Sequence, residues 1–340
     1  MTKIGVGMIG YGLAGRAFHA PFVTVTPGLE LRAVVSRDAA KVHADLPDMA
    51  VCPDVPALLA REDIGLVIVA SPDDLHAEHA LAALAAGKHV LVDKPFATCL
   101  ADARRVAAAG GAAGRLVTIF QNRRWDADFL TLRGLIAEGR LGEVVQFESH
   151  FDRWRPHPAA VWKEARTGGA WLDLGPHLVD QALRLFGLPT AVSADIATLR
   201  DGAPSADYFH VTLKYPDRRA ILHSSKLVAE HSLRFAVHGT GGSWIKHGFD
   251  PQEAASLQGV VPGSAGWGHD PSPGRLTGTD GAGADVAGVP GDYRLFWNAL
   301  AAALRGEGAN PVPPAEAIEV MRVLDAALRS ADAGCAVVVE

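Results

Sequence analysis

The sequence predicts an α/β fold in which a doubly wound parallel sheet is followed by an α+β domain with a large, mostly antiparallel open sheet. Up to about residue 120, short apolar runs of strand length alternate with alanine-rich segments of helical length, the pattern of a βαβ series. Beyond it the extended segments are longer and several alternate in polarity, which is typical of antiparallel sheets. The 340 residues fit two domains, predicted at 1–120 and 121–340.

The first domain is predicted to contain five parallel strands, because its apolar runs show no alternation and are therefore buried on both faces. These runs are residues 4–9, 31–36, 66–70, 89–93 and 116–120. The helices between them are predicted at residues 16–24, 74–86 and 100–109.

The second domain is predicted from segments that alternate with the period of a half-buried strand. Phe209, Val211, Leu213 and Tyr215 would face one way, and the residues between them the other. The predicted strands are residues 144–152, 191–199, 207–215, 219–227 and 232–237. The stretch 262–291 is rich in Gly, Pro, Ser and Asp, so we expect a long loop there. Two helices should close the chain, one from about Asp292 and one after Pro313-Pro314 with core positions Ile318, Met321, Leu324 and Leu328.

Composition excludes several function classes. With 32 Lys and Arg against 38 Asp and Glu, the formal net charge is −6, so we expect no nucleic-acid partner. No apolar run has the length of a membrane span and no signal peptide is evident, so neither membrane binding nor secretion is expected. The three cysteines form no CxxC pair, which fits the reducing cytoplasm.

A glycine-rich turn follows the first predicted strand and precedes a helix, the context of a Rossmann dinucleotide-binding site. In such a turn the first glycine allows the tight bend, the second allows the pyrophosphate to approach the backbone, and the third lets helix pack on strand. A purely structural turn is the alternative. The motif consists of Gly10, Tyr11, Gly12, Leu13, Ala14 and Gly15.

The end of the second predicted strand indicates which cofactor is bound. An Asp or Glu there would hold the ribose 2′-hydroxyl of NAD, but this strand ends in Ser36 followed by Arg37. A guanidinium suits a 2′-phosphate, so NADP is favoured and NAD stays possible because Asp38 is adjacent. Alternatively, Arg37 is a solvated surface charge.

Two further segments carry side chains suited to proton transfer. Asp93-Lys94-Pro95 follows the fourth predicted strand, at the sheet edge where doubly wound folds bind ligands. Further on, Gly168 to His177 leads into a helix. We expect Pro176 in the first turn of that helix, with Asp173 just before it and His177 just inside, so that both face one pocket.

These three motifs, in this order on a chain of this length, resemble the Gfo/Idh/MocA oxidoreductase family. The resemblance implies that Lys94, Asp173 and His177 are catalytic. Two positions depart from the family pattern: Asp93 replaces the usual Glu, and Asp73 replaces the usual Asn in the segment Ser71-Pro72-Asp73-Asp74-Leu75-His76.

Within the family, segments near Asn122, Phe151 and Asp173 resemble the branch of NADP-dependent scyllo-inositol dehydrogenases. The implied activity is hydride transfer between NADP(H) and a secondary alcohol of a cyclic polyol or sugar. Cofactor contacts are implied for Ser71, Pro72, His76, Asp93, Lys94 and Asn122, besides the glycine turn, Ser36 and Arg37. Substrate contacts are implied for Lys94, Arg123, Arg153, Asp173 and His177.

Several alternatives stay open from the sequence. The substrate could be an aldose such as glucose, or the chain could be a non-catalytic sensor of NAD(P). The cluster of Arg123, Arg124, Arg153 and Arg155 could hold a polyol or pair with carboxylates. Trp154, Trp162 and Trp171 could stack on a sugar or be buried. The histidines lack metal-ligand spacing, so no metal is expected.

The chain is predicted to form a homodimer or homotetramer. The helices of the second domain are too few to cover its sheet, and its uncovered face has a mixed composition, as subunit interfaces often do. Candidates for this face are Tyr208, His210, Ile221 and His223.

Overall fold

The computed structural model describes residues 3–159 and 168–340, which form two compact units. Each unit combines three segments of the chain. Unit 1 contains the chain up to Asn122, then Glu253–Trp267 and Tyr293–Ile318. Unit 2 contains Arg123–Gln252, Gly268–Asp292 and Glu319–Glu340.

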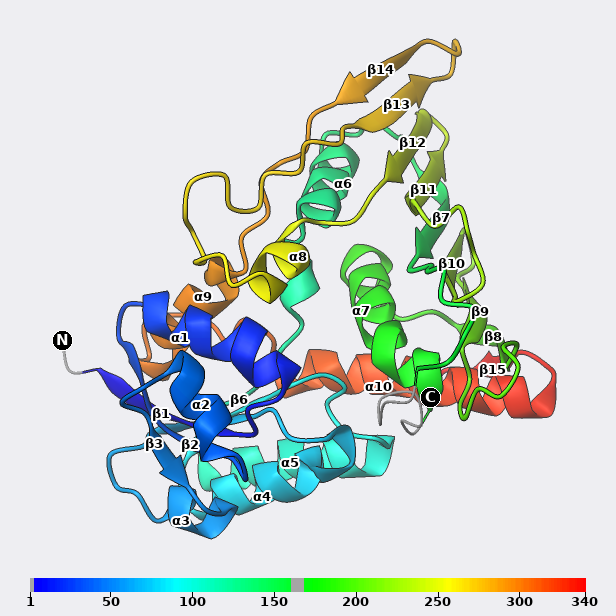
Figure 1. The fold of residues 1–340 in the computed structure, drawn as a ribbon. Helices are drawn as coiled ribbons and strands as arrows, with labels where there is room; N and C mark the ends of the chain where they lie inside the picture. The colour runs from blue at the N-terminus through cyan, green and yellow to red at the C-terminus, as the bar shows by residue number, and fades with distance from the viewer. Residues whose placement is uncertain (1–2, 160–167) are drawn as a thin grey trace. The chain divides into compact units, whose positions relative to one another are not determined.

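Unit 1 is built on a six-stranded parallel sheet with the strand order β3-β2-β1-β4-β5-β6. All four residues of β4 are buried, as expected for a strand covered on both faces. The predicted doubly wound sheet is confirmed (Figure 1). Its strands are β1 (Ile4–Ile9), β2 (Leu29–Val35), β3 (Ala50–Cys52), β4 (Leu66–Val69), β5 (His89–Val92) and β6 (Val117–Ile119).

The sequence analysis missed two helices of unit 1, α2 and α3, and also the strand β3. Both helices are short, and in each a single residue is buried. Asp38 and Asp54 cap them by accepting backbone hydrogen bonds, a signal that was present in the sequence. The helical segments are η1 (a π-helical turn, Gly15–His19), α1 (Ala20–Val25), α2 (Ala39–Asp45), α3 (Val55–Leu59), η2 (Asp73–Leu75), α4 (His76–Ala85), α5 (Leu100–Ala113) and α9 (Arg294–Leu304).

Unit 2 is built on a nine-stranded sheet with the order β14-β13-β12-β11-β7-β10-β9-β8-β15. Strands β7 and β10 pair in parallel, and the other pairs are antiparallel, so the predicted mostly antiparallel sheet is confirmed. The strands are β7 (Val144–His150), β8 (Ala191–Ala197), β9 (Tyr208–Lys214), β10 (Arg219–Ser225), β11 (Leu233–Gly239), β12 (Gly242–His247), β13 (Gly274–Gly278), β14 (Gly283–Val286) and β15 (Val337–Val338).

One face of this sheet packs on helix α7 (Gly169–Phe186) (Figure 1). Phe209 of β9 is fully buried and its ring lies 5.0 Å from that of Trp171, centroid to centroid. Trp171 also donates from Nε1 to the carbonyl of Leu324. The alternation predicted for β9 is confirmed, since Val211 is fully buried while His210 is exposed.

The prediction of a long loop over 262–291 is wrong for residues 274–286. Strands β13 and β14 form an antiparallel hairpin there, and β13 continues the sheet through its pairing with β12. Both strands are short and mostly exposed, so they lack the apolar alternation that identifies a strand. Helix α8 (Gln252–Leu257) was also missed.

The two predicted C-terminal helices correspond to α9 and to α10 (Pro314–Ala333). In α10, Met321 and Leu324 are buried, whereas Ile318 and Leu328 are half-buried. The remaining helix, α6 (Ala127–Ala137), belongs to unit 2. Within the described ranges, every helix is too short or too polar to cross a membrane.

Candidate functional site

The glycine turn after β1 has the geometry of a dinucleotide site. Gly10 has φ +100°, and a Cβ there would lie 2.6 Å from the carbonyl oxygen of Ala70. A Cβ on Gly15 would lie 2.6 Å from the Gly10 oxygen, so this glycine lets the helix start pack against the strand. A Cβ on Gly12 would meet no atom within 4 Å. The crowded first and third glycines and the open second one fit a pyrophosphate approaching the backbone at Gly12.

Beyond β2, the side chains next to the expected ribose position have distinct roles. Asp38 accepts a hydrogen bond from the backbone N–H of Lys41 at 2.9 Å and so caps α2. The Ser36 hydroxyl, 3.1 Å away, accepts from the Asp38 backbone N–H. Arg37 is exposed. The carboxylate is therefore held by the helix start, while the guanidinium is open to solvent.

The loops after β4 and β5 are joined by His76. Its Nδ1 lies 2.7 Å from the Pro95 carbonyl oxygen, and its Nε2 lies 3.0 Å from the Ser71 carbonyl oxygen. Pro72, also predicted to contact the cofactor, directly precedes the 3₁₀ turn η2. His76 thus connects the Ser71-Pro72 loop to the Asp93-Lys94-Pro95 loop.

The predicted catalytic Lys94 is half-buried beside a buried acid, Asp93. Asp93 accepts from the Lys94 backbone N–H at 2.8 Å, and its other oxygen lies 3.4 Å from Nε2 of His19. Burial acts to raise the pKa of Asp93, but its interaction with His19, together with His76 and Lys94, holds this pKa below the usual range. An ionised Asp93 therefore fixes the backbone that carries Lys94. The sequence analysis missed His19, whose only sequence signal was its place in the helix after the glycine turn.

Asp173 and His177 lie within α7, and the expectation that Asp173 precedes the helix is wrong. The helix begins at Gly169 and contains Pro176 in its interior. Pro176 cannot donate the backbone hydrogen bond to Leu172 that a helix would otherwise make; the helix nevertheless continues. Residues four apart share a helix face, so Asp173, half-buried, and His177, 5% exposed, lie on one face of one element.

The next turn of α7 is anchored by buried arginines. Arg124 binds both carboxylate oxygens of Asp180, at 2.8 and 2.6 Å. Gln181 donates to the Arg123 carbonyl at 2.9 Å and accepts from Arg234 at 2.7 Å. Such charge-assisted and bidentate bonds fix geometry, so they hold the helix that carries Asp173 and His177. Asp180 and Gln181 follow the Asp173 and His177 pair, and the sequence analysis assigned them no role.

The two arginines predicted to contact substrate surround an aromatic ring. The guanidinium carbon of Arg123 lies 4.7 Å from the centroid of Phe151, and that of Arg153 lies 5.4 Å from it. Arg123 is buried and pairs with Asp126 at 3.3 Å, whereas Arg153 is half-buried and stacks on Phe249 at 4.3 Å. Both therefore have protein partners in unit 2.

The structure describes some of the other residues that the sequence analysis named. Asn122 is buried at the start of the 3₁₀ turn η3 (Asn122–Trp125), shortly after β6. Trp171 is a core residue and Trp154 is 52% exposed. Trp162 lies outside the described residues.

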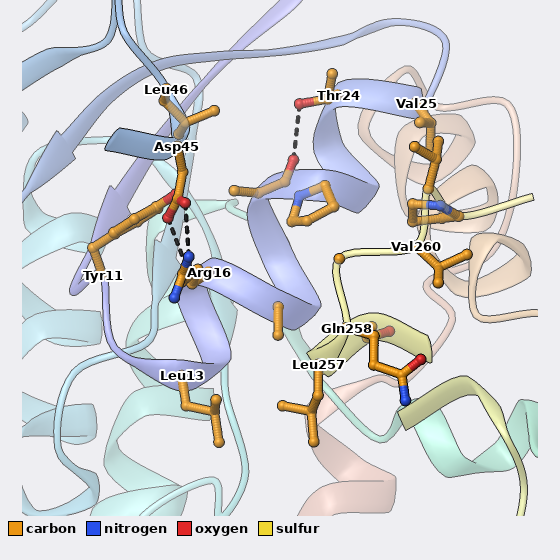
Figure 2. A pocket seen from close by; sticks show the side chains of 17 residues that line it. Tyr11, Leu13, Arg16, Thr24, Val25, Asp45, Leu46, Leu257, Gln258 and Val260 are labelled. Carbon is orange, nitrogen blue, oxygen red and sulfur yellow. Dashed lines mark hydrogen bonds and ion pairs between the residues drawn. The ribbon is translucent and has the colours of Figure 1, made fainter. Parts of the chain in front are cut away.

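A pocket of about 400 Å³ in unit 1 adjoins the glycine turn, with Tyr11 and Leu13 in its lining. Figure 2 shows Arg16 and Asp45 on one side of it and Leu257 on the other. Arg16 binds Asp45 through two hydrogen bonds of 2.6 and 2.8 Å. Burial, reinforced by Asp45, raises the pKa of Tyr11 to about 12. The sequence analysis did not identify Arg16 or Asp45, which lie far apart in the chain.

Comparisons with known proteins cover nearly the whole chain. Residues 4–121 match the oxidoreductase family's NAD-binding Rossmann fold, and residues 133–339 match its C-terminal alpha/beta domain, both of the Gfo/Idh/MocA type. The uncharacterized oxidoreductase YdgJ of Escherichia coli is 47% identical over 97% of this chain and 96% of its own length.

Two other relatives are similar over comparable lengths. The scyllo-inositol 2-dehydrogenase (NADP(+)) IolW of Bacillus subtilis is 36% identical over 97% of this chain and 94% of its own. The solved crystal structure of a Klebsiella pneumoniae protein, 48% identical, matches with a TM-score of 0.95 over 100% of this chain and 96% of that one.

Proposed function

Because the chain belongs to the Gfo/Idh/MocA family of oxidoreductases, we propose that it is an NADP(H)-dependent dehydrogenase that interconverts a secondary alcohol of a cyclic, inositol-like polyol and the corresponding ketone. The observation that carries this proposal is the glycine turn, where Gly12 is open while Gly10 and Gly15 are crowded. A relative that covers nearly the whole chain is an NADP-dependent scyllo-inositol dehydrogenase, which favours this substrate class over aldoses.

The described residues of unit 1 fit a dinucleotide. The backbone at Gly12 and the helix start at Gly15 would hold the pyrophosphate. Ser36 and Arg37 would hold the 2′-phosphate, because the exposed guanidinium forks onto phosphate oxygens and Asp38 is directed to the α2 cap. When bound, the nicotinamide cofactor supplies the hydride chemistry.

The protein's own residues would orient the substrate and move a proton. In the oxidative direction His177 takes the proton of the reacting hydroxyl, and Lys94 donates a hydrogen bond to the same oxygen. Asp173, one turn before His177 in α7, binds a neighbouring hydroxyl or orients the imidazole. Arg153, only half-buried, is the better placed of the two predicted arginines to contact a polyol.

The proposal also covers the roles of the two domains and the location of the protein in the cell. We assign cofactor binding to residues 1–120, and substrate binding and oligomerisation to 121–340. The cysteines Cys52, Cys99 and Cys335 are free, which fits a reducing cytoplasm.

The test is a substrate panel. Purified protein is incubated with NADP and with each of several inositol stereoisomers, glucose and other aldoses, and the reduced-nicotinamide absorbance is followed. The proposal expects the highest kcat/KM with an inositol. Turnover restricted to aldoses would overturn the substrate class. Tight NADPH binding without turnover on any compound would instead support a sensor.

A further inference from the structure

A cluster of metal-ligand side chains lies on the sheet of unit 2, outside the residues assigned to catalysis. His150 ends β7, Asp152 follows it, and His223 is on β10. Because β7 and β10 pair in parallel with His150 opposite His223, the two imidazoles project from the same face of the sheet. One potential ligand atom from each of the three residues lies within 4.8 Å of the others.

The carboxylate of Asp152 lies between the two rings. Its Oδ2 is 3.3 Å from Nδ1 of His150, and its Oδ1 is 3.4 Å from Nε2 of His223. Ligand atoms at about 2.0 to 2.1 Å from a tetrahedral zinc ion stand about 3.3 to 3.4 Å from one another. Each histidine nitrogen thus lies at this spacing from the Asp152 carboxylate, although each contacts a different one of its two oxygens.

Two contacts outside the cluster fix its donors. The backbone N–H of Ser225 donates to Oδ1 of Asp152 at 2.8 Å, which holds the buried carboxylate in place. Nε2 of His150 lies 3.2 Å from a carboxylate oxygen of Glu148. A ligating histidine usually donates its other N–H to a carboxylate in this way, which leaves Nδ1 of His150 directed toward the cluster.

The cluster faces away from α7. Phe209 of β9 packs on Trp171 of that helix, whereas His210, the next residue, is paired with His223 across the strands. In the single chain the two histidine side chains are partly accessible, at 14% for His150 and 16% for His223. The cluster is therefore on the opposite side of the sheet from the helix that carries His177.

We propose that His150, Asp152 and His223 form a binding site for a divalent transition-metal ion, with zinc as the type case. Two imidazoles and one carboxylate are ligands that suit Zn²⁺, Co²⁺ or Ni²⁺ rather than the oxygen-preferring Mg²⁺ and Ca²⁺. Three protein ligands leave a fourth position for water. The ion would join β7 to β10 and stabilise the sheet, with no part in hydride transfer.

The test measures zinc binding by isothermal titration calorimetry on metal-stripped full-length protein. Cys99 and Cys335 are exposed thiols, and thiols are zinc ligands, so every protein carries Cys99→Ser and Cys335→Ser. The parent should bind one ion per chain. Glu148→Gln removes only a contact to the ligand His150 and should weaken zinc affinity by about 10- to 100-fold. His150→Asn and Asp152→Asn each remove a ligand and should weaken zinc affinity more than that.

The matched control is His238→Asn, because His238 lies on the same sheet and binds Ser243 at 2.8 Å. It should leave the zinc affinity unchanged. Bound Co²⁺ should give a visible absorption spectrum that the parent shows and His150→Asn lacks, and NADPH binding reports whether each variant folds. The proposal is overturned if the parent binds no zinc, or if the His150→Asn/His223→Asn variant, still binding NADPH, keeps the parent's affinity.

Discussion

The carboxylate of Asp38 accepts a hydrogen bond from the backbone N–H of Lys41 at 2.9 Å and is thereby held at the start of α2. This contact bears on which cofactor, NAD or NADP, the end of β2 would bind. An acidic residue near this position normally binds the ribose 2′-hydroxyl of NAD, but here the carboxylate caps a helix. The exposed Arg37 next to it is left as the group that a 2′-phosphate would meet.

Arg37→Ala should weaken NADP binding far more than NAD binding. Loss of a charge-assisted contact costs about 1.5 to 3 kcal/mol, which is roughly 10- to 150-fold in Kd. Fluorescence titration with NADPH and NADH measures both. Arg32→Ala is the matched control, because Arg32 is also an exposed arginine of this strand region and pairs with Glu30. Equal losses for both cofactors would show that Arg37 does not bind the 2′-phosphate.

Gly12→Ala should weaken binding of either cofactor while the protein stays folded. A Cβ at Gly12 meets no protein atom within 4 Å, so the added methyl group occupies only the space assigned to the pyrophosphate. Gly111→Ala in α5 also adds a Cβ in open space, and it should leave cofactor binding unchanged. Calorimetric titration with NADPH, with thermal unfolding as the folding control, distinguishes the two. Unchanged affinity in Gly12→Ala would remove the pyrophosphate from this turn.

Asp250 should make stability fall as the pH rises. Its carboxylate accepts hydrogen bonds from the Ala127 and Gln252 backbone N–H groups, but burial and the nearby Asp128 raise its pKa to about 6. Because the Asp250 carboxyl group holds its proton more tightly in the folded than in the unfolded protein, protonation stabilises the fold. This stabilisation is complete at pH values below the unfolded pKa near 3.9 and is lost as the pH rises through the folded pKa of about 6. The unfolding free energy of the wild type minus that of Asp250→Asn should therefore fall by about 2 to 3 kcal/mol between pH 4 and 7.

Urea unfolding at a series of pH values measures this difference. Asp217→Asn is the control, because Asp217 is exposed and its hydrogen bond to Arg218 lowers its pKa, so its pH dependence should have the opposite sign. A flat or rising difference for Asp250→Asn would refute the assignment.

The open face of the unit 2 sheet should mediate self-association. Around the exposed His210, the residues Tyr208, Ile221 and His223 are half-buried, and mixed faces of this kind are typical of subunit interfaces. Light scattering after gel filtration should give a dimer or tetramer of the 35.7 kDa chain, with closed symmetry. A monomer across micromolar concentrations would contradict this prediction.

The sequence was sufficient where a local pattern determines the structure. The apolar run of β4 and the glycine turn after β1 each carry their own signal, so the parallel sheet and the NAD-binding Rossmann fold were predictable. The predicted start of α7 was wrong because proline favours the first turn of a helix, whereas Pro176 lies in the interior of α7. The His150, Asp152 and His223 cluster could not be predicted, because it exists only once β7 and β10 pair, and their register is set by the whole sheet.

The measurement that tests the central claim most directly is the initial rate of NADP reduction with the best inositol, for wild type, Lys94→Ala and His177→Ala, alongside NADPH affinity. Because both side chains are assigned to the substrate's oxygen and proton rather than to the phosphates, the account predicts at least about a 100-fold loss of kcat in each variant with NADPH affinity nearly unchanged. Near-normal kcat in either variant with NADPH still bound would contradict it.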